Sequence, residues 1–228
     1  GFGAEALVRL WNAQGERISP ATFIPLAERT GLIVPVECWV LGQALDCLAQ
    51  WQRQGRPWSL SVNISPQHLE RGDLVEQLLK EQQRSGADLS ALTVEITETV
   101  VLQAQAEAHE RLLQLKAAGV RIALDDFGTG YSSLAWLSRL PVDAVKLDQT
   151  YVQQMDEDER CARLVQGFVR VFQDMGLQVV AEGVETEAQR DFLVREGCTG
   201  FQGFLYCGPL PVAALEQYLG GASQRGAT

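Results

Sequence analysis

The feature that most constrains the fold of this chain is a repeated alternation of amphipathic and β-rich segments. Apolar residues recur at helical spacing, a glycine ends each such stretch, and a short β-rich run follows it. The glycines that end these stretches are Gly55, Gly86, Gly119, Gly176 and Gly197. Glycine is common just after a helix because that position needs a positive φ. A repeat of this kind requires parallel strands joined by helical crossovers.

The β-rich runs predict one parallel sheet. In chain order they are residues 4–10, 59–65, 92–98, 121–127, 144–148, 178–184 and 200–207. Several runs are apolar at successive positions, as in Val179-Val180-Ala181, so both faces of the sheet should be buried. Such burial fits either an α/β barrel or a doubly wound sheet. Seven runs are one short of a closed eight-stranded barrel, and we expect a further strand before Gly1.

The charge balance excludes several classes of partner. The formal net charge is −10, and such a field repels nucleic acid polymers and anionic membranes. No apolar run approaches the roughly 18 residues that a membrane span needs, so we expect a cytoplasmic domain without membrane contact. Because the chain begins with Gly rather than Met, we also expect it to belong to a larger, multidomain or membrane-anchored protein.

The cysteines and histidines form no metal motif. The five cysteines include no Cys-x-x-Cys pair, so neither a disulfide framework nor a zinc site is indicated, and we expect small core residues. The two histidines, His68 and His109, lie in polar helical sequence and are predicted to be at the surface.

Polar residues at the ends of the predicted strands carry the functional signal. They are Glu5, Asn63, Glu95, Glu98, Asp125, Asp126, Lys146, Asp148, Glu182 and Glu185. An isolated charge in a buried strand is costly unless it is paired or binds a metal. The carboxyl ends of parallel strands are also where α/β folds build their sites. Because nearly every strand contributes such a residue, we predict that they form one site.

The residue types favour a hard divalent cation. Carboxylate and amide oxygens suit Mg²⁺ or Mn²⁺. Adjacent Asp125 and Asp126 would repel each other unless cations lay between them, and one carboxylate can bridge two metals. The alternative is that this pair only caps a helix before the Gly128-Thr129-Gly130 loop.

Seven motifs, taken in order, resemble the EAL-domain family of cyclic di-GMP phosphodiesterases. They are Glu5-Ala6-Leu7-Val8-Arg9, Val62-Asn63-Ile64-Ser65, Glu95-Ile96-Thr97-Glu98, the segment from Asp125 to Leu134, Lys146-Leu147-Asp148, Glu182-Gly183-Val184-Glu185 and Gln202-Gly203-Phe204. The resemblance implies a modified TIM (βα)8 barrel over residues 1–219, with residues 220–228 as a flexible tail. It also implies that the family's first strand, which is antiparallel, is missing or truncated here.

The resemblance also implies a role for each site residue. Two Mg²⁺ or Mn²⁺ ions would be held by Glu5, Asn63, Glu95, Asp125, Asp126 and Glu182, with Asp125 shared. Lys146, Glu182 and Asp126 would be catalytic, and Lys146 would lie beside the attacking water. Substrate would contact Leu7, Arg9, Gln202 and Asp148, and Asp148 would also help to position Lys146. Glu98, Glu185 and the loop Gly128, Thr129 and Gly130 would support the site.

The implied reaction is metal-dependent hydrolysis of cyclic di-GMP, a bacterial second messenger, to linear pGpG. A homodimer that forms near residues 125–140, and regulation by sensor or cyclase domains, are implied in the same way. One alternative is a catalytically quiescent cyclic di-GMP receptor, although this sequence keeps every ligand. Another is an enolase-type lyase, which also uses strand-end carboxylates, Mg²⁺ and a lysine but has a capping domain and a different motif order.

Overall fold

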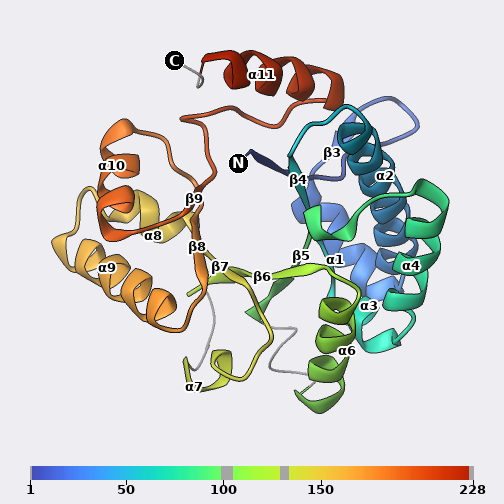
Figure 1. Cartoon of the computed structure of the whole chain (residues 1–228), viewed down its shortest axis with the longest axis horizontal. Coiled ribbons are helices and arrows are strands. Elements are labelled where there is room, and N and C mark those ends of the chain that lie inside the picture. The colour runs from blue at the N-terminus through green and yellow to red at the C-terminus, as the bar shows by residue number, and fades with distance from the viewer. Residues whose placement is uncertain (1, 99–104, 129–133, 226–228) are drawn as a thin grey trace.

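The computed structural model describes residues 2–98, 105–128 and 134–225. Its centre is a curled sheet with the order β1-β4-β5-β6-β7-β8-β9, and every pairing in it is parallel (Figure 1). The strands of this sheet are β1 (Gly3–Ala6), β4 (Ser59–Asn63), β5 (Leu92–Thr97), β6 (Arg121–Phe127), β7 (Ala144–Leu147), β8 (Gln178–Ala181) and β9 (Gly200–Phe201). A separate hairpin pairs β2 (Leu10–Trp11) with β3 (Arg17–Ile18).

Helices surround this sheet in Figure 1. They are α1 (Pro20–Thr30), α2 (Ile33–Arg53), α3 (Pro66–Arg71), α4 (Leu74–Ser85), α6 (Gln105–Ala117), α7 (Leu134–Leu137), α8 (Gln149–Gln154), α9 (Glu159–Asp174), α10 (Glu187–Glu196) and α11 (Val212–Arg225), with a 3₁₀ turn η1 at Leu89–Ala91. The glycine stops act as predicted: Gly86 and Gly197 end α4 and α10 in the left-handed region, with φ of 75° and 100°.

The strand order confirms the predicted α/β barrel and excludes the doubly wound alternative. Strands follow one another around the sheet in chain order, whereas a doubly wound sheet reverses its order part-way across. The curled sheet has its two edges at β1 and β9, and no strand among the described residues pairs between them. The core lies between strands and helices, where Phe127 of β6 packs edge-on against Phe172 of α9 at 4.8 Å.

Several predicted strands extend too far at their carboxyl ends. The run at residues 4–10 is wrong beyond Ala6, because pairing with β4 stops there and Leu10 belongs to the separate hairpin. The runs at 59–65, 178–184 and 200–207 also end early, at Asn63, Ala181 and Phe201. At these ends the backbone leaves the sheet. Propensity alone does not mark that point.

The last helix, α11, lies against the end of the first long helix, α2. Trp51 of α2 donates its indole N–H to Glu216 of α11 at 2.9 Å, although the two residues lie 165 positions apart. Helix α11 continues to Arg225, so most of the segment predicted as a tail from residue 220 onward is helical. Residues 226–228 lie outside the described residues.

The structure corrects one histidine prediction. His68 is completely buried rather than at the surface, because it packs beneath α2 and pairs with Glu37. His109 is half-buried. Among the cysteines, Cys161 and Cys198 are buried as predicted, whereas Cys38, Cys47 and Cys207 are only partly covered. No single helix among the described residues is long and apolar enough to cross a membrane, although α1 and α2 pass that test as a pair bent by 117°.

Candidate active site

One lysine lies at the centre of the predicted residues. The ammonium of Lys146, only 3% exposed, lies 2.7 Å from Glu95 Oε2 and 2.8 Å from Glu182 Oε1. It lies 3.0 Å from Asp125 Oδ1 and 3.6 Å from Glu5 Oε2. These carboxylates come from or directly follow β5, β8, β6 and β1. The structure therefore brings together side chains that the sequence places at separate strand ends.

Two amides extend the cluster to the edges of the sheet. Asn63, the last residue of β4, donates to Glu5 Oε1 at 2.7 Å, and Gln202, which follows β9, donates to Glu5 Oε2 at 2.8 Å. Glu5 therefore joins the first and last strands of the sheet although β1 and β9 are not paired. The orientation of its carboxylate is fixed from both sides.

A β-bulge explains how two consecutive aspartates can serve one site. Successive side chains of a regular strand point to opposite faces. In β6 the register shifts between Leu124 and Phe127, and Asp126 has a φ of 54°. A carboxylate oxygen of each of Asp125, Asp126 and Glu182 lies within 4.8 Å of the others. The left-handed backbone at Asp126 costs about 1–3 kcal/mol, and such strain is typical of functional positions.

The carboxylates outnumber the ammonium, and burial raises the pKa of two of them. Burial raises the pKa of Glu95 to about 7, and the charges of Glu5 and Asp125 add to the effect against Lys146. Burial also raises the pKa of Glu182 to about 7. Burial alone would lower the pKa of Lys146, but the surrounding carboxylates, Glu95 and Glu182 foremost, raise it overall. The site therefore favours cations.

The residue pair Glu98 and Gly128 anchors the segment after β6. Glu98 Oε1 accepts the N–H of Gly128 at 2.8 Å, and the Gly128 carbonyl accepts the hydroxyl of Tyr151 at 3.0 Å. Glu98 therefore bonds to Gly128, the first residue of the predicted loop. Thr129 and Gly130, which complete the predicted loop, lie outside the described residues.

The structure also describes the remaining predicted residues, Leu7, Arg9, Asp148 and Glu185. Leu7 is 43% exposed, and Arg9 is half-buried, with its guanidinium donating to the Val8 carbonyl at 3.0 Å. Asp148 is buried and caps α8 by accepting the Thr150 N–H at 2.9 Å. Glu185 is exposed, and its backbone N–H donates to Gln189 at 2.8 Å. These hydrogen bonds of Asp148 and Glu185 lie within their own turns.

Sequence reasoning missed Glu37, a buried carboxylate of α2 that bonds to the segment after Asn63. The signal was present, because Glu37 interrupts the otherwise apolar run from Ile33 to Val40. The strand-end pattern does not include it, because Glu37 lies in a helix. Tyr151 was missed as well, and a tyrosine in a short helix carries no comparable signal.

Alanine at Gly128 is expected to destabilise the chain and to release the loop from Glu98. A Cβ there would lie 2.3 Å from the Tyr151 ring, at a φ of 100°. Gly86 is a matched control, since its φ is 75° but no atom lies within 4 Å of an added Cβ. Denaturant unfolding should show that G128A loses about 1–3 kcal/mol more than G86A. Equal losses would mean that backbone conformation alone, and not the Tyr151 contact, matters.

The EAL domain family model matches residues 2–209 of this chain. The chain is 40% identical over 215 residues to the bifunctional diguanylate cyclase/cyclic di-GMP phosphodiesterase MucR of Pseudomonas aeruginosa, covering 94% of this chain and 31% of MucR. It is 37% identical to the cyclic di-GMP phosphodiesterase PdeR of Escherichia coli, covering 94% of this chain and 32% of PdeR. The chain thus spans about a third of the length of these relatives.

Solved structures agree with this match. The PaMucR phosphodiesterase in complex with c-di-GMP superposes with a TM-score of 0.88 at 40% identity, covering 92% of this chain and 86% of that one. The EAL enzyme Bd1971 in its cAMP-bound form gives a TM-score of 0.89 at 28% identity, covering 94% of this chain and 61% of that one. The seven-stranded sheet is therefore the modified TIM barrel of EAL domains.

Proposed function

Since this chain belongs to the EAL domain family, we propose that it hydrolyses one phosphodiester of cyclic di-GMP to give linear pGpG. The observation that carries the proposal is the Lys146 cluster, in which one buried ammonium contacts carboxylates from four strands. The similarity to a phosphodiesterase solved with c-di-GMP supports the choice of substrate.

The residues present fit a hard divalent metal. Asp125 Oδ1 is buried and accepts no hydrogen bond from the described part of the chain, although it lies 3.0 Å from the Lys146 ammonium. Oxygen donors from carboxylates and an amide suit Mg²⁺ or Mn²⁺ better than zinc. We propose that Glu5, Asn63, Glu95 and Asp125 hold one ion and that Asp125, Asp126 and Glu182 hold a second. When bound, such ions neutralise phosphate oxygens and favour hydroxide at neutral pH.

The chain's own residues would orient the substrate and stabilise the negative charge that develops on its phosphate. We propose that Arg9, two residues after the exposed Leu7, contacts a substrate phosphate, and that Gln202, which bonds to Glu5, lines the same site. Lys146 would stabilise the negative charge that develops at phosphorus as water adds. Because pGpG keeps its 5′ phosphate, the bond that breaks joins phosphorus to a 3′ oxygen. Water supplies the hydroxyl on phosphorus and the proton on that leaving oxygen.

The direct test is incubation of the purified chain with cyclic di-GMP and Mg²⁺ or Mn²⁺, with nucleotides separated by liquid chromatography. We expect pGpG to accumulate with each metal and to stop when EDTA is added. An E5A variant should need more metal for half-maximal activity, because it loses a first-site ligand that two amides hold in place. Binding of cyclic di-GMP without pGpG would contradict the hydrolase and favour the receptor alternative.

We propose further that the chain acts as a homodimer within a larger protein that carries sensor or cyclase domains. The length of the relatives supports the larger protein, since each is about three times as long as this chain, and the homodimer follows from the family resemblance alone. The dimer is expected near residues 125–140, of which 129–133 lie outside the described residues. Sedimentation equilibrium of the isolated chain measures its mass directly, and a monomer at all concentrations would exclude the dimer.

A further inference from the structure

A buried carboxylate in α2 has no role in the proposed chemistry. Glu37 is only 7% exposed and lies among the buried apolar residues Ile33, Val34 and Leu41 of the same helix. Burying an acid in such a place is unfavourable unless its oxygens are fully bonded. An apolar side chain would suit the helix better, so the acid calls for a specific explanation.

Both oxygens of Glu37 bind the segment that follows β4. Glu37 Oε1 accepts the backbone N–H of Ser65 at 2.8 Å, and Oε2 lies 2.9 Å from His68 Nδ1. The Ser65 hydroxyl in turn accepts the His68 N–H at 3.3 Å and caps α3. Ser65, His68 and Glu37 are all buried. We refer to these three residues as the Glu37 clamp.

The Glu37 clamp lies directly beside a proposed metal ligand. Asn63 is the last residue of β4, two positions before Ser65, and the intervening Ile64 donates its N–H to the Glu95 carbonyl at 2.9 Å. The Asn63 side chain is exposed, so packing does not fix its direction. Its backbone is instead held by β5 on one side and by the Glu37 clamp on the other.

We infer that Glu37 and His68 are positioning residues that hold Asn63 in place for metal binding. The inference rests on the proposed metal site, and it assigns a function to a pair that no part of the reaction uses. Groups that orient metal ligands commonly influence metal affinity without touching the ion. Here Glu37 acts through the backbone, because it holds the N–H of Ser65, which is two residues after Asn63.

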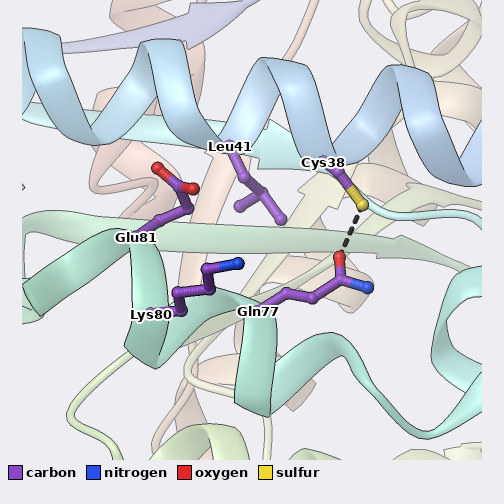
Figure 2. A pocket seen from close by; sticks show the side chains of 5 residues that line it. All are labelled: Cys38, Leu41, Gln77, Lys80 and Glu81. Carbon is purple, nitrogen blue, oxygen red and sulfur yellow. Dashed lines mark hydrogen bonds between the residues drawn. The ribbon is translucent and has the colours of Figure 1, made fainter. Parts of the chain in front are cut away.

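A pocket between α2 and α4 provides a control position (Figure 2). It measures about 290 Å³ and is lined by Cys38, Leu41, Gln77, Lys80 and Glu81. Figure 2 shows Cys38 and Gln77 pointing toward each other across this pocket, with Cys38 Sγ 2.5 Å from Gln77 Oε1. Cys38 Sγ also lies 3.9 Å from His68 Nε2. Cys38 therefore approaches the clamp at His68, and among the described residues no hydrogen bond joins its thiol to Ser65, so C38A should leave Asn63 in place.

The test is direct Mn²⁺ binding to the whole chain, measured by calorimetry without substrate, alongside thermal unfolding and hydrolysis. E37L removes both clamp bonds, and we expect it to weaken Mn²⁺ binding about 10–100-fold. E37Q should recover most of the affinity, because its amide oxygen still accepts from Ser65 and its NH₂ pairs with the other His68 tautomer. C38A should bind Mn²⁺ as the wild type does.

A second control separates positioning from loss of stability. Glu216 also accepts hydrogen bonds from α2, donated by Gln50 and Trp51. Trp51 packs on Trp58, which directly precedes β4, so this contact lies at the start of the strand and not at Asn63. E216L should therefore lower the melting temperature without weakening Mn²⁺ binding. If E37L binds Mn²⁺ with unchanged affinity, or if E216L weakens it equally, the inference is overturned.

The same data distinguish this inference from the proposed function. Wild-type chain that binds Mn²⁺ but releases no pGpG would refute the hydrolase while leaving the Glu37 effect measurable. Wild-type chain that hydrolyses cyclic di-GMP while E37L keeps full Mn²⁺ affinity would refute the positioning role alone.

Discussion

Replacing Lys146 with alanine is expected to lower kcat by about a hundredfold to a thousandfold while cyclic di-GMP still binds. The ammonium lies within 3.0 Å of Glu95, Glu182 and Asp125, where the substrate phosphate would meet the carboxylates. Its loss removes the positive charge that would stabilise the transition state. Pre-steady-state turnover and equilibrium binding of cyclic di-GMP measure the two effects separately.

The same substitution should destabilise the metal-free chain. Removing one partner from a buried ion cluster typically costs about 3–5 kcal/mol, because the other charges stay buried without compensation. Mn²⁺ can replace the lost positive charge, so the stability difference between K146A and wild type should narrow as Mn²⁺ is added. Denaturant unfolding with and without Mn²⁺ measures this difference.

Lys116 offers a matched lysine for control. It pairs with Asp143, near the start of β7, and is about a third exposed. K116A should leave kcat and Mn²⁺-dependent stabilisation unchanged. Near-normal turnover by K146A would show that Lys146 does not stabilise the transition state. An equal stability loss with and without Mn²⁺ would show that Mn²⁺ does not replace the lost positive charge.

Replacing Asp125 with asparagine is expected to reduce kcat/KM by about a thousandfold, because several kcal/mol of charge stabilisation would be lost. Asp125 is the one carboxylate assigned to both metals, and the substitution keeps its shape while removing its charge. Calorimetric titration with Mn²⁺ should show fewer than two ions bound per chain. The readout is the binding stoichiometry together with steady-state kinetics.

D143N is the matched control for this change. Asp143 lies directly before β7, and its carboxylate accepts the Ile122 N–H of β6 at 2.8 Å. It lies outside the Lys146 cluster. It should bind the same number of ions as wild type. Two ions bound by D125N with full activity would show that Asp125 does not bridge them.

The cluster was predictable because strand ends in a parallel barrel converge. Glu5, Glu95, Lys146 and Glu182 lie in different sequence motifs, yet once the strands are assigned they must share one edge of the sheet. The expectation of Mg²⁺ or Mn²⁺ followed from oxygen donors alone. The substrate did not, since carboxylates and a lysine serve several reactions, and only the family resemblance specified cyclic di-GMP.

Other features depend on tertiary contacts that no local pattern encodes. The bulge at Asp126 arises from the shifted pairing of β6 with β7, and the sequence shows only two adjacent aspartates. His68 reads as a surface residue because its neighbours in α3 are polar, but α2 covers it. Its partner Glu37 lies 31 positions away. Pairings between distant segments decide burial in each case.

The bond between Gln202 and Glu5 has a consequence for synthesis of the chain. The two side chains are 197 positions apart and meet at 2.8 Å. Because the ribosome makes the chain from its amino end, Glu5 emerges long before Gln202. The bond between them can form only after Gln202 has emerged as well. Contacts of such sequence separation form late in folding. We therefore expect a nascent chain to remain without a finished site until its last strand has left the ribosome.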